Sequence, residues 1–166
     1  RTLRLFTILF LVSSVVSALE LRVMTYNIHH AEGTDGLLDI DRIVEVIKAA
    51  NPDIVCLQEV DQNLSRTNRM DMPALFREKL GMASVFGPNF PFDNGDYGNL
   101  ILSKYPVKTY QNIALPNPFN QEPRGCLRAM IEIPASSTRH QSQKITILNT
   151  HLGLIPEERL KQAAHI

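Results

Sequence analysis

The sequence has no excess of charge of either sign, only two cysteines, and neither an internal repeat nor a low-complexity tract. Its 17 lysine and arginine residues equal its 17 aspartate and glutamate residues. A balanced chain lacks the electrostatic footprint of a tight nucleic-acid binder, although it can still hold a few phosphates locally. The cysteines, Cys56 and Cys126, each lie in an apolar run. Pairing in an oxidising compartment and burial as free thiols both remain open.

The N-terminal segment contains an apolar run, residues 5–11, that is too short to cross a bilayer comfortably. Arg1 and Arg4 precede the run, and small residues ending at Ala18 follow it. This order is typical of a secretory signal peptide, and the alternative is an uncleaved membrane anchor. We expect cleavage near Ala18 and a secreted or periplasmic protein. The remaining domain, residues 19–166, has 148 residues with 15 basic and 17 acidic side chains.

The first folded unit has the pattern strand, helix, strand. Residues 21–28 form a strand that the glycines of "EGTDG" end. The next apolar residues follow helical spacing: Ile40, Ile43, Val44 and Ile47. Asp39 or Asp41 can cap this helix, and Asn51-Pro52 ends it. Residues 54–57 are continuously apolar, as in a strand covered on both faces. This βαβ-like opening predicts a layered α/β or α+β domain.

The remainder of the chain is richer in strands. We expect a polar loop over residues 61–73, a short helix over 74–80 that Gly81 ends, and a long irregular segment over 83–98. Further strands are predicted over residues 99–103, 105–115, 126–133 and 144–152. A Pro-rich connection (115–125), a polar hairpin loop (134–143) and a helix from residue 156 complete the prediction.

Polar side chains follow three of the predicted strands. Asn27 comes after "RVMTY", Glu59 after "IVCLQ" and His151 after "ITILNT". Strand ends in layered α/β folds present side chains to ligands. A carboxylate suits Mg²⁺, an asparagine positions a water or phosphoryl oxygen, and a histidine can donate to developing negative charge. Taken singly, the three residues are equally well a strand cap, a surface glutamate and a core histidine.

Four motifs in order, "TYNIH", "PDIVCLQEV", "YGNLILSKYP" and "NTHL", resemble the endonuclease/exonuclease/phosphatase superfamily of metal-dependent phosphohydrolases. The resemblance extends from Leu21 to about Gln162. It implies a DNase I-like, two-sheet sandwich with flanking helices. By this resemblance Asn27 contacts the phosphate or a metal-bound water, Glu59 binds the metal, and His151 stabilises the phosphoryl group.

The same resemblance implies weaker assignments. Gly98 lies in the strand motif that supports the site, and Asn99 beside it is a candidate substrate-binding residue. Arg124, in "EPRGCLRA", suits a phosphate because a guanidinium can bind it bidentately, although a solvated loop arginine is as good an interpretation. Some members of the superfamily have an acidic residue near the metal at the position where this chain has His29. The resemblance therefore does not imply a second metal position in this chain.

The superfamily's later motifs, an Asp-x-Asn pair, a further Asp and an Asp-His dyad that activates the attacking water, have no counterpart after His151. The sequence also stops at Ile166 within a predicted helix. We therefore interpret the chain as the N-terminal portion of a Mg²⁺-dependent phosphodiesterase, with Mn²⁺ as the other metal considered, and expect this fragment to be inactive. The substrate is nucleic acid, a phospholipid headgroup or another phosphoester, and we expect a monomer without an obligatory protein partner. The alternatives are a non-catalytic secreted binding protein on the same scaffold and a membrane-tethered structural protein.

Overall fold

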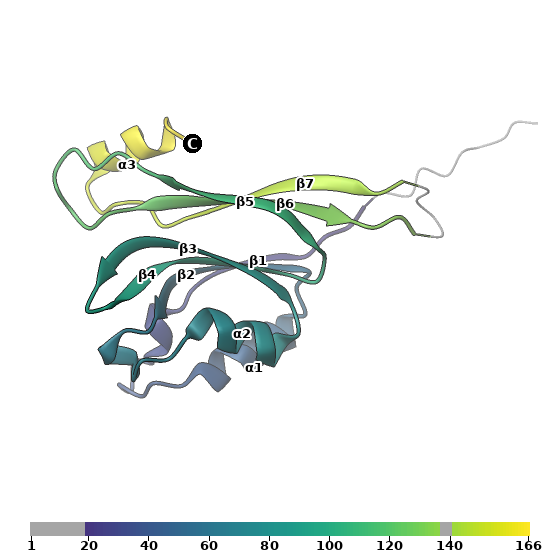
Figure 1. Ribbon diagram of the computed structural model, residues 1–166, viewed down its shortest axis with the longest axis horizontal. Helices are drawn as coiled ribbons and strands as arrows, with labels where there is room; N and C mark the ends of the chain where they lie inside the picture. Colours follow the sequence, from purple (N-terminus) through teal and green to yellow (C-terminus); the bar gives the residue numbers. More distant parts are fainter. Residues whose placement is uncertain (1–18, 137–140) are drawn as a thin grey trace, which may run out of the picture.

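The computed structural model describes residues 19–136 and 141–166. The expected signal peptide, residues 1–18, and part of the expected hairpin loop lie outside the described residues. Two β-sheets pack face to face, two helices cover the outer face of one sheet, and a third helix lies beside the other (Figure 1). The expected two-sheet α/β sandwich with flanking helices is confirmed.

The first sheet has the strand order β1-β2-β4-β3, and the second has the order β5-β6-β7. The strands are β1 (Val23–Asn27), β2 (Ile54–Gln62), β3 (Ala83–Phe92), β4 (Gly95–Ser103), β5 (Val107–Ala114), β6 (Gly125–Ile133) and β7 (Gln143–Thr150). The helices are α1 (Ile40–Ala50), α2 (Met72–Leu80) and α3 (Pro156–Ala163), with 3-10 turns η1 (His29–Ala31) and η2 (Ser65–Thr67). None of the helices in the described ranges is long and apolar enough to cross a membrane.

The opening unit is the predicted βαβ arrangement, because β1 and β2 pair in parallel and α1 connects them. The side chain of Asp39 accepts a hydrogen bond from the backbone N–H of Arg42, so Asp39 is the helix cap. Asn51 ends α1 in the left-handed conformation, with φ of 46°. Local capping chemistry therefore sets both ends of this helix, as the sequence predicted.

Helix α2 is also set by its caps. Asp71 accepts from the backbone N–H of Ala74, Pro73 occupies the first turn, and Gly81 ends the helix with φ of 63°. The helix starts two residues earlier than predicted because the cap is Asp71 rather than a later residue. The residues before it are less irregular than expected, since β2 continues to Gln62 and η2 follows.

The prediction of an irregular segment over residues 83–98 is wrong. These residues form the antiparallel hairpin of β3 and β4, joined by Asp93 and Asn94, which both have positive φ (50° and 56°). Such two-residue turns match the twist of paired strands. The prolines Pro88 and Pro91 are tolerated because β3 is an edge strand, and the register shifts between Pro88 and Phe90.

The core lies in two layers on either side of the first sheet. One layer packs between that sheet and helices α1 and α2, and the other lies between the two sheets. Both Cys56 and Cys126 are buried and free, which decides between the two alternatives in favour of free thiols. Burial raises the pKa of Cys56 to about 11, so this thiol stays protonated at neutral pH.

A buried asparagine connects the two sheets. Asn149, near the end of β7, is 2% exposed. Its Nδ2 donates to the carbonyl oxygens of Leu57 (2.8 Å) and Leu100 (3.0 Å), and its Oδ1 accepts from Nε2 of Gln58 (2.7 Å). Because these partners belong to β2 and β4, Asn149 fixes the position of β7 against the first sheet directly beside the candidate site.

Candidate active site

Asn27 and Glu59 meet at the carboxyl ends of two neighbouring parallel segments. Asn27, the last residue of β1, pairs with Gln58 of β2, which precedes Glu59. The Nδ2 of Asn27 donates to Oε1 of Glu59 at 2.7 Å, while its Oδ1 accepts from the backbone N–H of His29 at 3.0 Å. The amide is therefore held at both ends. A carboxylate has about four acceptor positions, so Glu59 keeps most of its capacity for other partners.

Glu59 does not end its strand as predicted, because β2 continues to Gln62. The residue lies instead in a bulge, where the pairing of β2 with β4 shifts register between Leu57 and Val60. Its φ of 59° is left-handed, which costs energy for a residue other than glycine. Bulges and strained residues of this kind cluster beside active sites, where they redirect a side chain.

His151 and Arg124 extend the site from the second sheet. Arg124 immediately precedes β6, His151 immediately follows β7, and these strand ends pair through Cys126 and Thr150. The Nη1 of Arg124 lies 3.4 Å from Nδ1 of His151, and that Nδ1 lies 3.8 Å from Oε1 of Glu59. The structure thus brings together residues that the sequence separates by up to 124 positions.

The tautomer of His151 follows from its partner. A guanidinium can only donate, so Nδ1 of His151 accepts and Nε2 carries the proton. Burial, and then the positive charge of Arg124, lower the pKa of His151, and they outweigh the opposite effect of Glu59 and Glu122. The 3.8 Å approach to Glu59 is therefore a contact of a neutral imidazole, not an ion pair. A neutral His151 presents an N–H donor.

Arg124 is only 9% exposed, so it is not the solvated loop residue of the alternative interpretation. Its Nη1 pairs with Oε1 of Glu122 at 2.7 Å. Its Nε is buried and has no hydrogen-bond partner among the described residues. An unsatisfied buried donor is costly, and at a site it indicates a partner that the chain itself does not supply.

Two residues of this cluster were missed by sequence reasoning. Tyr97 on β4 is 9% exposed, and burial, then the charges of Glu59 and Glu122, raise its pKa. Glu122 partners Arg124 from the Pro-rich connection before β6. Tyr97 is the first residue of the "YGNLILSKYP" motif, but nothing in the sequence indicates that it lies near Glu59 and Glu122, because this depends on the pairing of β2 with β4.

Asn99 lies beneath the site. It is 1% exposed, and its Nδ2 donates to the carbonyl oxygens of Gly125 (3.0 Å) and Asn149 (3.5 Å). The carbonyl of Gly125 also accepts from the hydroxyl of Thr150 at 3.0 Å. The structure therefore places the amide nitrogen of Asn99 against the backbone that carries Arg124 and His151, on the side facing the core.

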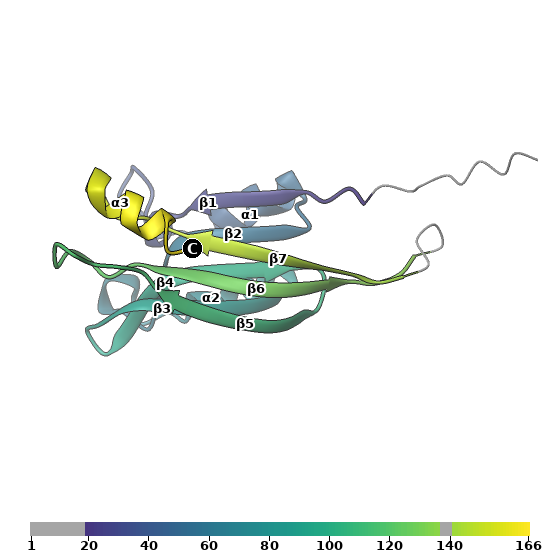
Figure 2. The ribbon, with the colours of Figure 1, turned by 90° about the horizontal axis from the view of Figure 1, so that it is seen from above.

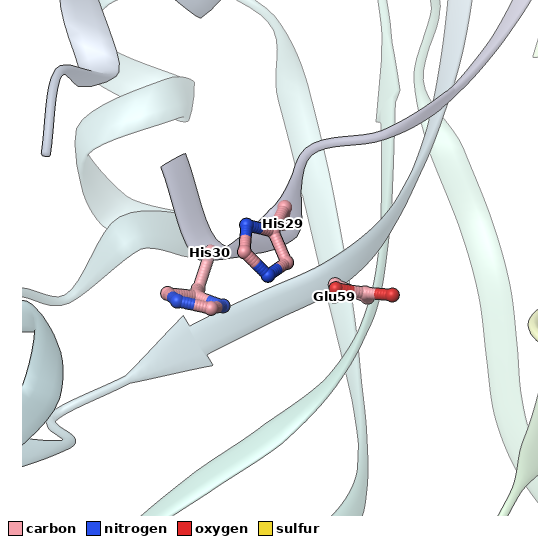
Figure 3. A group of neighbouring side chains, drawn as sticks. All are labelled: His29, His30 and Glu59. Atoms are coloured by element: carbon pink, nitrogen blue, oxygen red, sulfur yellow. The ribbon is translucent and has the colours of Figure 1, made fainter. Parts of the chain in front are cut away.

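The side chains of His29 and His30 lie beside Glu59 (Figure 3). One potential ligand atom from each of the three residues lies within 4.8 Å of the others. His29 is the position at which relatives were expected to carry an acidic residue. The donor set of Glu59, with Asn27 holding its carboxylate, fits a divalent cation, because such ions take carboxylate oxygen together with water or imidazole.

Two packed sheets with this polar cluster at one shared end define an α/β sandwich with a site formed between its layers. The model of the endonuclease/exonuclease/phosphatase family matches residues 24–149. Escherichia coli K12 YbhP, described as an uncharacterized protein, is 27% identical over 154 residues, which cover 86% of this chain and 57% of YbhP. The chain belongs to the endonuclease/exonuclease/phosphatase family, and the predicted resemblance is confirmed.

Solved structures agree with this assignment. An endonuclease/exonuclease/phosphatase from Beutenbergia cavernae superposes with a TM-score of 0.72 and 26% identity, covering 87% of this chain and 42% of that one. Truncated Caenorhabditis elegans TDP2 gives a TM-score of 0.61 and 26% identity, covering 87% and 51%. The human Nocturnin catalytic domain, at 24% identity, shares the fold, with a TM-score of 0.63. The chain thus spans about half the length of these relatives.

Proposed function

We propose that this chain forms part of a metal-dependent phosphodiester hydrolase. The observation that carries the proposal is the meeting of Glu59 and Asn27 from the first sheet with His151 and Arg124 from the second. Separations of 2.7, 3.4 and 3.8 Å link these four side chains into one cluster. Negative and positive side chains that lie this close together suit a site that binds a divalent cation and a phosphate next to each other.

In this proposal Glu59 holds a divalent cation, Mg²⁺ or Mn²⁺, and Asn27 positions the carboxylate. Such an ion polarises the phosphoryl oxygen and neutralises developing charge. Arg124 binds a phosphoryl oxygen through its unsatisfied Nε–H, which is buried and already desolvated. His151, neutral and protonated on Nε2, donates to the charge that grows on the phosphoryl group in the transition state. Asn99 acts behind them as a positioning residue rather than as a substrate ligand.

We further propose that this chain alone does not turn over its substrate. His151 is not placed to deprotonate an attacking water, since its Nδ1 lies against Arg124. The superfamily pattern supplies that step from later motifs. The substrate class is a phosphodiester of nucleic acid, a lipid headgroup or another phosphoester, and the enzyme acts as a monomer.

The test reads the gene past the codon for Ile166 and, where the reading frame continues, compares this chain with the longer product. Both are assayed with bis(p-nitrophenyl) phosphate and Mg²⁺ or Mn²⁺. We expect turnover only from the longer product, and its loss by at least about a hundredfold in Glu59→Gln. Turnover by this chain that depends on Glu59 would refute the inactivity. A longer product without any phosphoesterase activity would instead favour the non-catalytic binding protein.

The export of the protein is a separate proposal that rests on residues 1–18 alone. Cleavage after Ala18 would release a secreted or periplasmic protein that starts at Leu19. N-terminal sequencing of the exported protein tests this directly. An intact N-terminus that fractionates with membranes would support the membrane-tethered alternative.

A further inference from the structure

Two adjacent histidines stand next to Glu59, the residue proposed to hold the metal (Figure 3). His29 and His30 form the start of η1, which follows β1 after the single residue Ile28. Their ring centroids are 4.3 Å apart, with the ring planes inclined by 48°. Neighbouring side chains in an extended strand point to opposite faces, so this pairing depends on the turn that follows β1.

The backbone of that turn is unusual. His29, His30 and Ala31 all have positive φ, of 46°, 42° and 63°. L-residues other than glycine rarely adopt this conformation, and three in succession persist only where the surroundings hold them. Here Asn27 accepts from the backbone N–H of His29, and Ile28 accepts from that of Ala31 at 2.9 Å. The result is that both imidazoles are directed to the same region as the Glu59 carboxylate.

Glu32 holds one ring nitrogen of each imidazole. The Nδ1 of His29 lies 3.3 Å from the backbone carbonyl oxygen of Glu32, and Nε2 of His30 lies 3.2 Å from its Oε2. Because a carbonyl and a carboxylate accept, each of these nitrogens donates. The opposite nitrogens, Nε2 of His29 and Nδ1 of His30, then carry the lone pairs. Histidines that bind metals in proteins are held in this way, with the other ring N–H on a carbonyl or carboxylate.

We propose that His29, His30 and Glu59 bind one divalent ion as a two-nitrogen, one-oxygen site that prefers Zn²⁺ or Mn²⁺ to Mg²⁺. Imidazole is a ligand for transition metals, whereas Mg²⁺ selects oxygen. Three protein ligands leave further coordination positions for water or substrate. The inference deepens the proposed function, since it rests on Glu59 as the metal ligand of that site. Asn27 and Glu32 are positioning residues.

The alternative occupant of a histidine pair is an anion. The Glu59 carboxylate within the same group of atoms disfavours an anion there, whereas it adds a ligand for a cation. Ligands about 2.1 Å from one ion lie at most about 4.2 Å apart, so the 4.8 Å cluster needs only a small side-chain adjustment to close. The exposed position of His29 leaves room for this movement.

The experiment is a metal titration of the whole chain, with Mg²⁺ and Mn²⁺ followed by calorimetry and Zn²⁺ by competition with a chromogenic chelator. We expect one Zn²⁺ per chain, bound at least about a hundredfold more tightly than Mg²⁺. His29→Ala should weaken Zn²⁺ binding by at least about tenfold, and Glu32→Gln by about tenfold, with Mg²⁺ binding little changed. His165→Ala is the matched control, because His165 is an exposed histidine next to α3.

His30 is 9% exposed, so its replacement risks misfolding, and His29→Asn provides a second variant that leaves the buried ring intact. Unchanged Zn²⁺ affinity in both His29 variants overturns the inference. Mg²⁺ binding that needs Glu59 but not His29, without a Zn²⁺ preference, also overturns it and leaves the proposed function standing. Zn²⁺ binding that needs His29 and Glu59, without hydrolysis by the longer gene product, supports the metal site and refutes the hydrolase.

Discussion

Replacement of Asn149 tests whether the two sheets are joined by the polar contacts seen beneath the site. Asn149→Ala removes both donors from the buried carbonyls of Leu57 and Leu100. Each buried carbonyl that is left without this hydrogen-bond donor costs about 1–3 kcal/mol of stability. The Gln58 side chain loses only one of its hydrogen bonds, because its Nε2 still donates to Oγ1 of Thr25 and to the Cys56 carbonyl oxygen, both at 3.1 Å. We therefore expect Asn149→Ala to lower the free energy of unfolding by about 3–5 kcal/mol.

The assay is urea unfolding followed by far-UV circular dichroism. Asn149→Asp separates the two contributions, since it preserves side-chain volume but replaces the donors with oxygen that faces two carbonyls. If the hydrogen bonds matter more than the cavity, Asn149→Asp should cost at least as much as Asn149→Ala. Asn117→Ala is the matched control, because Asn117 is only half-buried and makes two hydrogen bonds, both to Gln121, that are exposed to water; it should cost under about 1 kcal/mol.

The reasoning would be refuted if Asn149→Ala stayed within about 1 kcal/mol of the parent chain, a typical effect of an arbitrary substitution. It would also be refuted if Asn117→Ala were equally destabilising. If Asn149→Asp lowered the free energy of unfolding only slightly while Asn149→Ala lowered it strongly, the effect would come from packing alone. The hydrogen bonds between the sheets would then contribute no net stability.

Three further predictions concern the supports of the first sheet. Arg66 makes a bidentate pair of 2.6 and 2.7 Å with Asp61, which is fully buried, so Arg66→Ala should cost about 3–5 kcal/mol in urea unfolding. Gly98→Ala would place a Cβ against the backbone of the neighbouring strand β3, and we expect soluble yield and thermal midpoint to fall sharply. The backbone N–H of Arg22 holds the pKa of Asp53 below its ordinary value. The contribution of Asp53 to the free energy of unfolding is therefore present above the pKa that this carboxyl has in the unfolded chain, and it is lost as pH falls through the lower pKa of the folded state. Asp53→Asn should flatten the pH dependence of stability below about pH 4.

The first two of these predictions each have a control within the chain. Lys48→Ala breaks an exposed pair with Glu45 and should cost under about 0.5 kcal/mol, in contrast to Arg66→Ala. Gly36→Ala has open space around it but a φ of 73°, so it measures backbone strain of about 1 kcal/mol without a clash. An unchanged acid dependence in Asp53→Asn would show that the Arg22 contact does not contribute to stability.

The sequence predicted those elements whose determinants are local. Both ends of α1 could be located because Asp39 caps an N–H only three residues away and because asparagine tolerates the left-handed conformation that ends the helix at Asn51. The hairpin of β3 and β4 was missed because its prolines and its Asp93-Asn94 turn have the composition of a loop. Only the sheet order, which makes β3 an edge strand, permits those prolines, and sheet order is not a local property.

The residues of the candidate site also fall into those that the sequence predicted and those that it did not. Asn27, Glu59 and His151 were predicted because each interrupts an apolar strand, and the structure brings all three together. Tyr97 and Glu122 were missed because their relation to the site arises from strand register and from the path of a connection. The strained backbone at His29 and Glu59 was also unforeseen, since positive φ is uncommon for any residue other than glycine.

The division of the site between two sheets has a mechanical consequence for the proposed hydrolase. The first sheet carries Glu59, and the turn after its strand β1 carries His29 and His30, the other proposed metal ligands. The ends of the second sheet carry the proposed phosphate contacts, Arg124 and His151. The distance between a bound cation and a bound phosphate therefore depends on how the sheets are offset (Figure 2). Asn149 fixes this offset within two residues of His151. A substitution there should misplace the phosphate contacts relative to the metal ligands, because catalysis is sensitive to displacements of about 1 Å.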